Sequence, residues 1–170
     1  MGCDSVRGSA ALFSSRSGDW ATPEDRFAEW DREFGFTLDV CSDHLNAKCD
    51  QYYTTHDDGL TQPWGGRAWG NPPYGRTVGQ WIAKGIAEAH ENRKCRGVVF
   101  LLPARTDVRW FHDLIWDTSS AHPRTGISVR FLRGRLRFND ATTGAPFPSM
   151  LVIVRGASNA RRLCAALPDL

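Results

Sequence analysis

The 170-residue sequence contains no apolar run that approaches the roughly 20 residues needed for a membrane-spanning helix. Its first residues do not show a charged segment followed by an apolar one, which is the pattern of an export signal. No internal repeat is present either. These absences predict a globular protein of the cytoplasm that does not associate with a membrane.

Cysteine is sparse as well, with five residues that are scattered along the chain and odd in number. Without an export signal, such a set is expected to consist of reduced thiols and not of disulfides. Cys41, His44, Cys49 and His56 have the spacing C-x2-H-x4-C-x6-H, loosely like a zinc knuckle. Structural zinc sites usually come from closely spaced ligand pairs on turns, and Cys41 ends a predicted strand, so no metal is expected. A zinc-stabilised interaction domain remains an alternative.

Acidic residues are missing between Thr118 and Asn139, although the formal net charge of the whole chain is only +2. Residues 1–90 carry 8 Lys and Arg against 13 Asp and Glu, whereas residues 91–170 carry 13 against 6. The acid-free stretch contains five arginines: Arg124, Arg130, Arg133, Arg135 and Arg137. A solvated surface is the simplest interpretation, but such a cluster is also typical of a site for a polyanion, which we favour.

The pattern of apolar residues predicts one domain over residues 19–170, preceded by a flexible tail over residues 1–18 that is rich in Ser, Gly and Ala. The first helix is expected to use the Thr22 hydroxyl as its cap, with Pro23 at the first helical position. Its apolar face contains Phe27 and Trp30, and Gly35 is expected to end it.

Strands and helices are predicted to alternate along the rest of the domain. Strands are expected at residues 36–41, 67–70, 97–103 and 150–154, helices at 78–89, 107–116 and 159–167, a polar binding loop at 50–64, and a tight hairpin at 127–132 and 135–138 around Gly134. The apolar run at 97–103 suits the middle of a parallel sheet. This alternation predicts an α/β sheet with helices on both faces and ligands beyond the carboxyl ends of its strands.

The tetrapeptide Asn71-Pro72-Pro73-Tyr74 follows one of these strands directly. Proline fixes its own backbone and restricts the residue before it, so the segment is stiff and extended. The Asn71 side-chain oxygen and the Pro72 carbonyl oxygen can then accept both hydrogens of one planar NH2 group, and the Tyr74 ring can stack on its base. Fixed acceptors of this kind stabilise the positive charge that develops when the nitrogen attacks. An ordinary strand-ending turn is the alternative interpretation.

The tetrapeptide resembles the catalytic motif of methyltransferases that modify amino groups with S-adenosylmethionine. In order along the chain, the sequence resembles the phage-type Dam family of DNA N6-adenine methyltransferases at Trp20–Pro23, Phe36–Cys41, Asn46–Cys49, Tyr53, Asp57–Leu60, Trp64, Asn71–Tyr74, Leu101–Asp107, Trp110–His112, Arg133–Arg135, Phe138 and Ala145–Ser149. The resemblance covers nearly all of the predicted domain, from about Trp20 to Gly156.

The resemblance implies a compact, Rossmann-like methyltransferase sheet, encoded by a phage or prophage and acting on DNA as a monomer or weak dimer. It implies that the enzyme extrudes an adenine from the duplex, because N6 is buried there. Asn71, Pro72, Pro73 and Tyr74 are then the expected catalytic residues, and the expected cofactor residues are Trp20, Thr22, Pro23, Asp39, Cys41, Asp58 and Asn71. The expected DNA contacts are Arg76, Arg105, Arg109, Arg133, Arg135 and Arg137.

One departure from the broader methyltransferase pattern is that no G-x-G loop follows the strand ending near Asp39. That loop serves ligands with phosphates, whereas S-adenosylmethionine carries an ammonium, a sulfonium and ribose hydroxyls, which suit carboxylates. A helix-cap role for Asp39 remains an alternative.

Two classes of rival function also remain. The same chemistry can serve another amine, such as cytosine N4, guanine N2 in RNA or a protein glutamine, although the arginine cluster disfavours a protein substrate. A nucleic-acid-binding module that has the fold without turnover is the other rival.

Overall fold

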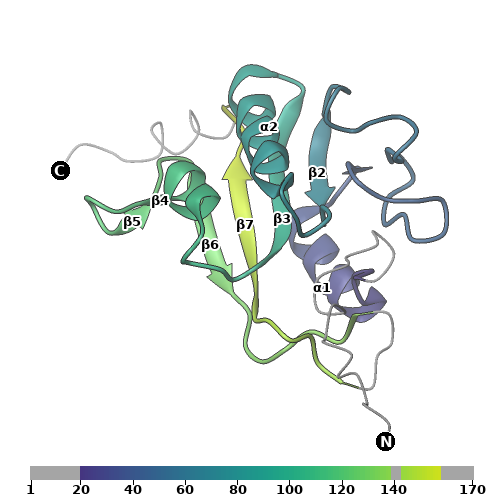
Figure 1. Cartoon of the computed structure of the whole chain (residues 1–170). Helices are drawn as coiled ribbons and strands as arrows, with labels where there is room; N and C mark the ends of the chain where they lie inside the picture. Colours follow the sequence, from purple (N-terminus) through teal and green to yellow (C-terminus); the bar gives the residue numbers. More distant parts are fainter. Residues whose placement is uncertain (1–19, 139–142, 158–170) are drawn as a thin grey trace, which may run out of the picture.

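The computed structural model describes residues 20–138 and 143–157. The helices and strands, shown in Figure 1, are α1 (Glu24–Phe34), β1 (Leu38–Asp39), β2 (Gly66–Gly70), α2 (Val78–Glu91), β3 (Cys95–Pro103), the π-helix η1 (Phe111–Ile115), β4 (Trp116–Asp117), β5 (His122–Pro123), β6 (Ile127–Phe131) and β7 (Ser149–Arg155). The predicted tail at 1–18 and the predicted helix at 159–167 lie outside the described residues.

The main sheet has five strands in the order β1-β2-β3-β7-β6. β1, β2 and β3 are parallel, while β7 is antiparallel to both β3 and β6. The α/β class is therefore confirmed. Residues 97–103 were expected in the middle of a parallel sheet, and this is correct for their pairing with β2 but not for their pairing with β7, which is antiparallel. The chain reverses direction between β6 and β7, so β7 enters the sheet from the opposite end.

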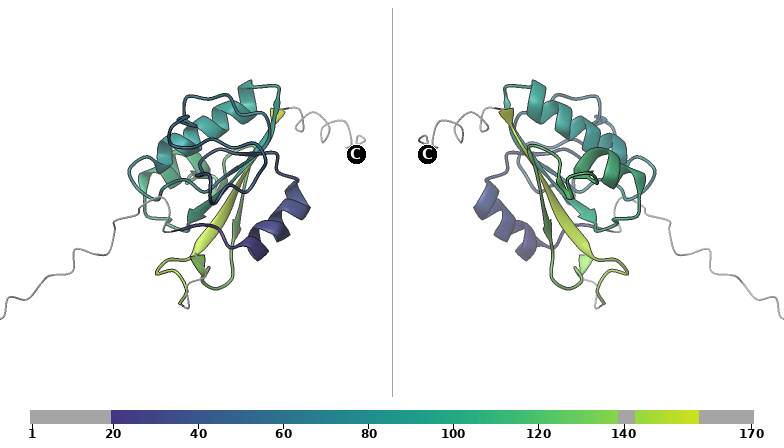
Figure 2. Two further views of the ribbon diagram at one scale, coloured as in Figure 1. Left: turned by 90° about the vertical axis from the view of Figure 1, so that its right-hand side faces the viewer. Right: turned by 90° about the vertical axis from the view of Figure 1, so that its left-hand side faces the viewer.

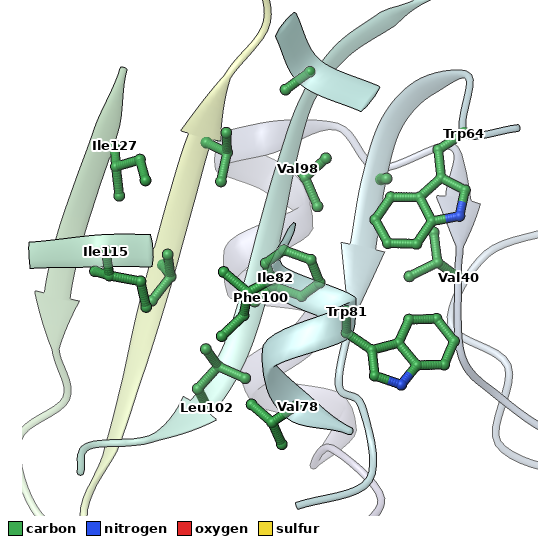
Figure 3. Packing of buried hydrophobic residues seen from close by; sticks show 14 of the residues in the cluster. Val40, Trp64, Val78, Trp81, Ile82, Val98, Phe100, Leu102, Ile115 and Ile127 are labelled. Atoms are coloured by element: carbon green, nitrogen blue, oxygen red, sulfur yellow. The ribbon is translucent and has the colours of Figure 1, made fainter. Parts of the chain in front are cut away.

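The two long helices cover opposite faces of this sheet (Figure 2). On β3, Val98, Phe100 and Leu102 pack in the core under α2, with Trp64, Trp81 and Ile82 (Figure 3). Val99 and Leu101 alternate to the other face and pack under α1. Burial on both faces explains why this strand is continuously apolar.

The start of α1 differs from the prediction. The helix begins at Glu24, and Pro23 takes the capping position with an extended ψ of 136°. No side chain caps the helix, because the Thr22 hydroxyl accepts a hydrogen bond from Asn71 instead. The end is as predicted, since Gly35 adopts the left-handed conformation with φ 64°.

Three other predicted elements need correction. Residues 135–138 are not a strand, and β6 pairs with β7, so the hairpin around Gly134 is wrong. The helix expected at 107–116 is a short helical turn followed by η1 and β4. The strand expected at 36–41 is reduced to Leu38–Asp39, and the chain enters a long loop after Val40, whose N–H still donates to the Trp69 carbonyl oxygen of β2 at 2.9 Å.

Within the described ranges, no helix is both long and apolar enough to cross a membrane.

Candidate active site

The carboxyl ends of the three parallel strands lie at one edge of the sheet, and Asn71 follows β2 there. Its amide nitrogen donates hydrogen bonds to the Trp20 carbonyl oxygen at 2.8 Å and to Thr22 Oγ1 at 3.1 Å. These two bonds tie the tetrapeptide Asn71–Tyr74, which we call the clamp, to the segment that precedes α1. They also set the orientation of the amide, so that its oxygen points to Tyr74.

The Tyr74 hydroxyl donates to Asn71 Oδ1 at 2.7 Å. Burial raises the pKa of the Tyr74 phenol well above its usual range, so the hydroxyl keeps its proton at neutral pH. An amide oxygen has two lone pairs, and Tyr74 occupies one of them. Within the described residues no group donates to the Pro72 carbonyl oxygen.

A cavity of about 230 Å³ opens beside the clamp. Its lining consists of Trp20, Cys41, Ser42, Asp43, Thr54, Thr55, Asp58, Gly59, Asn71, Pro72, Pro73, Tyr74 and Trp81. Three aromatic rings and two carboxylates therefore surround one hollow. Small-molecule sites typically measure about 300–1,000 Å³. The cavity lies just below this range.

The cavity brings together Trp20, Cys41, Asp58 and the whole clamp, all of which the sequence nominated. The nominated Thr22, Pro23 and Asp39 do not line it. Sequence reasoning missed six of its lining residues: Ser42, Asp43, Thr54, Thr55, Gly59 and Trp81. Thr54, Thr55 and Gly59 lie in the loop at residues 50–64, which was predicted to bind a ligand. The length and polarity of this loop were the sequence features that could have identified these residues. No sequence pattern marks Trp81 as a cavity residue, because it also packs in the hydrophobic core under α2.

Asp39 lies beneath the cavity wall, with only 3% of its surface exposed. Its two carboxylate oxygens accept hydrogen bonds from the Cys41 N–H at 3.2 Å and the Lys48 N–H at 3.1 Å. Burial raises the pKa of Asp39 to about 6, and these bonds oppose the rise only in part. The residue therefore organises the start of the loop that carries Cys41, Ser42 and Asp43.

We expect Asp39 to make stability depend on pH. Because its folded-state pKa lies above the ordinary value of 3.8, ionising this carboxyl costs stability as the pH rises from about 4 through about 6. Relative to Asp39→Asn, which does not titrate, the wild type should lose about 2 kcal/mol of unfolding free energy between pH 4 and pH 7. Urea denaturation of both proteins across this range measures the difference. A difference that does not vary with pH contradicts the assignment.

The two carboxylates of the cavity, Asp43 and Asp58, differ in how many hydrogen bonds they already accept within the protein. Asp43 Oδ1 accepts hydrogen bonds from the Leu45 and Asn46 N–H groups, and its Oδ2 accepts from the Asn46 amide, so the side chain mainly holds a turn. Asp58 accepts one long bond, 3.3 Å, from the Leu60 N–H. Its φ of 52° is unusual for a residue other than glycine, and such strain tends to occur at functional sites. Asp58 is therefore the better candidate to face a ligand.

All six nominated arginines are exposed: Arg76, Arg105, Arg109, Arg133, Arg135 and Arg137. Arg133, Arg135 and Arg137 are not in a strand, but exposure still alternates there, because Leu136 and Phe138 point inward and are buried. Two arginines of the acid-free stretch have other tasks. Arg130 forms a bidentate pair with Glu33, and Arg124 donates to the His112 carbonyl oxygen.

The four residues with knuckle-like spacing do not form a metal site. Among residues 20–138 and 143–157, no three His, Cys, Asp or Glu side chains are grouped so that they can hold an ion. His44 instead contacts the Tyr52 hydroxyl at 2.9 Å.

Comparison with known proteins adds independent information. Residues 10–166 match the family described as "DNA N-6-adenine-methyltransferase (Dam)". The chain is 28% identical over 137 residues to the "DNA N-6-adenine-methyltransferase" of Haemophilus phage HP1, covering 79% of this chain and 76% of the phage protein. It is 43% identical over 63 residues to the Escherichia coli (strain K12) protein named "Putative methyltransferase YfdM", covering 32% of this chain and 69% of that protein.

Proposed function

Since the chain belongs to the Dam family of DNA N-6-adenine-methyltransferases, we propose that the cavity beside Asn71–Tyr74 is where it transfers a methyl group to adenine N6. The observation that carries this proposal is the orientation of the Asn71 amide. Its nitrogen is tied to Trp20 and Thr22, so its oxygen faces the side of the clamp where Tyr74 and the cavity lie.

The clamp acts by accepting hydrogen bonds from the target amine. The Asn71 oxygen and the Pro72 carbonyl oxygen each accept a hydrogen bond from one of the two N6 hydrogens. These bonds draw the nitrogen toward the tetrahedral geometry that it needs for attack. These acceptors stabilise the developing positive charge, and their positions are set before the reaction. The Tyr74 ring stacks on the base. When N6 binds, the Tyr74 hydroxyl either keeps its hydrogen bond to the Asn71 oxygen beside that of N6 or releases this bond.

The donor set of the cavity fits S-adenosylmethionine. Asp58 and Asp43 offer carboxylates to a cationic ligand, the Thr54 and Thr55 hydroxyls suit ribose or amino-acid groups, and Trp81 offers an aromatic edge. When bound, the cofactor supplies a methyl group on a cationic sulfur. We infer that Trp20, Cys41 and Asn71 complete the cofactor site, while Asp39, Thr22 and Pro23 act by holding its walls in place.

We also infer that the sheet is Rossmann-like. Support comes from the three parallel strands β1–β3, the helices on both faces and the site beyond the strands' carboxyl ends. The enzyme binds DNA, and the exposed Arg133, Arg135 and Arg137 are its proposed phosphate contacts.

Identification of the methylated nucleoside tests this proposal directly. Unmethylated phage DNA is incubated with the protein and labelled S-adenosylmethionine, digested to nucleosides and separated by chromatography. We expect label in N6-methyldeoxyadenosine alone. Label in N4-methyldeoxycytidine points to the rival amine, and absence of label despite DNA binding points to an inactive binding module.

A further inference from the structure

We propose that Phe138 and Phe147 are positioning residues for methyl transfer, which hold the rings of Trp20 and Tyr74 as the aromatic walls of the cavity. We call these four residues the aromatic brace. The inference rests on the proposed function of the cavity and adds to it the residues that keep its walls in place.

The brace is a mutual contact of four rings. The Trp20 ring meets Phe138 at 5.2 Å between centroids and Phe147 at 5.0 Å. The Tyr74 ring meets the same two residues at 6.5 Å and 5.5 Å. Three of these contacts are close to perpendicular, with interplanar angles of 75–84°, and the Trp20–Phe147 pair lies at 63°. Edge-to-face contacts at these distances are favourable and directional, so they set ring orientation as well as position.

Phe138 and Phe147 are the rings against which Trp20 and Tyr74 pack. Within the described residues, every aromatic contact of either wall is with Phe138 or Phe147. The hydrogen bonds from Asn71 and Tyr74 fix one backbone oxygen and one hydroxyl, and neither bond by itself sets the plane of a ring. The two phenylalanines therefore supply the constraint that the clamp itself does not.

Phe138 and Phe147 lie on the two arms of the connection from β6 to β7, residues 132–138 and 143–148. These arms are joined to each other and to the end of β3. The Ala145 N–H donates to the Leu136 carbonyl oxygen at 2.8 Å, the Ala104 N–H donates to the Pro148 carbonyl oxygen at 2.8 Å, and Leu136 and Ala145 are buried. Because these backbone bonds do not involve the phenylalanine rings, the loss of one ring should leave the fold in place and release the walls.

The arm at residues 132–138 also carries the exposed Arg133, Arg135 and Arg137. Arg137 directly precedes Phe138, which is only 2% exposed. A DNA contact at Arg137 therefore lies one residue from a ring that touches both walls. The brace thus places a proposed DNA-binding arginine one residue along the chain from a ring that packs against the proposed base pocket.

Phe147→Leu tests the inference, with Phe34→Leu as the matched control. Both phenylalanines are half-buried and pack against the core under α1, but Phe34 lies at the end of α1 and does not touch the cavity. We expect both variants to lose similar thermal stability. Below both melting temperatures, Phe147→Leu should lower kcat on unmethylated phage DNA about tenfold or more, with little change in the KM for DNA. Phe34→Leu should stay within about twofold of the wild type.

A conservative variant separates positioning from packing. Phe147→Tyr retains the ring and should recover most of the kcat lost in Phe147→Leu. If Phe147→Leu does not fold, Phe147→Met is judged by the same criterion. The inference is overturned if the kcat of the truncated variant matches that of Phe34→Leu, or if the tyrosine does not restore it. Either result leaves the proposed function standing, since that function depends on Asn71 and on the identity of the product.

Discussion

Asn71→Ala is expected to lower kcat about 10²–10³-fold, which is the usual consequence of removing one preorganised hydrogen-bond partner of a transition state. The substitution removes the amide oxygen that the proposed mechanism places against N6. It also removes the two donor bonds to Trp20 and Thr22, so a modest drop in melting temperature should accompany it. Affinity for S-adenosylmethionine should change far less than kcat, because most of the cavity lining remains.

Asn71→Asp is the informative partner variant. It keeps an oxygen acceptor for the amine but cannot donate to the Trp20 carbonyl. Its kcat is therefore expected to fall between those of the wild type and the alanine variant. Label transfer to unmethylated DNA gives kcat, and equilibrium binding of the cofactor shows whether its site persists. If Asn71→Ala keeps kcat within about threefold of the wild type, the clamp is not the catalytic element.

Tyr74→Ala is expected to lower kcat/KM for DNA about 10–100-fold, since base stacking on an aromatic side chain contributes about 1–3 kcal/mol. Tyr74→Phe keeps the ring and the contacts with Phe138 and Phe147 but loses the hydrogen bond to the Asn71 oxygen. If stacking is what matters, the phenylalanine variant should stay within a few-fold of the wild type. Steady-state kinetics at saturating cofactor gives the kcat/KM for DNA of both variants and allows this comparison.

A fall in Tyr74→Phe as large as that in Tyr74→Ala argues against stacking. It assigns the role of Tyr74 to its hydroxyl, which then orients the Asn71 amide. The phenol does not need to ionise in either case, because burial keeps its pKa well above neutral pH.

The clamp was predictable from the sequence because its properties are local. Proline restricts the backbone of Asn71–Pro72 whatever surrounds it, and a strand ending in such residues presents them at the edge of a sheet. The same reasoning placed α2, β3 and β7 close to their observed bounds, since burial against one or two faces leaves a periodic or continuous apolar pattern. Gly35 at the end of α1 was predictable for a similar reason.

Other parts of the site depend on which segments meet. The Thr22 hydroxyl had two possible partners, the N-terminus of a helix or a distant amide, and the approach of Asn71 from β2 selected the amide. The sequence left Asp39 equally suited to bind the cofactor or to cap a helix, and in the fold its carboxylate accepts from the N–H groups of Cys41 and Lys48. Residues 127–138 had a hairpin pattern, but β7 offered β6 a longer partner than residues 135–138 did.

The chain alone therefore specified the stiff clamp, the alternation of strands and helices, and the division into an acidic and a basic half, because each is a property of neighbouring residues or of composition. The folded arrangement decided that Phe138 and Phe147 meet Trp20 and Tyr74, that Trp81 reaches the cavity, and that Asp39 is buried beneath it. These contacts join residues far apart in the sequence. Their energies exist only once the sheet has brought those residues together, and no local pattern encodes them.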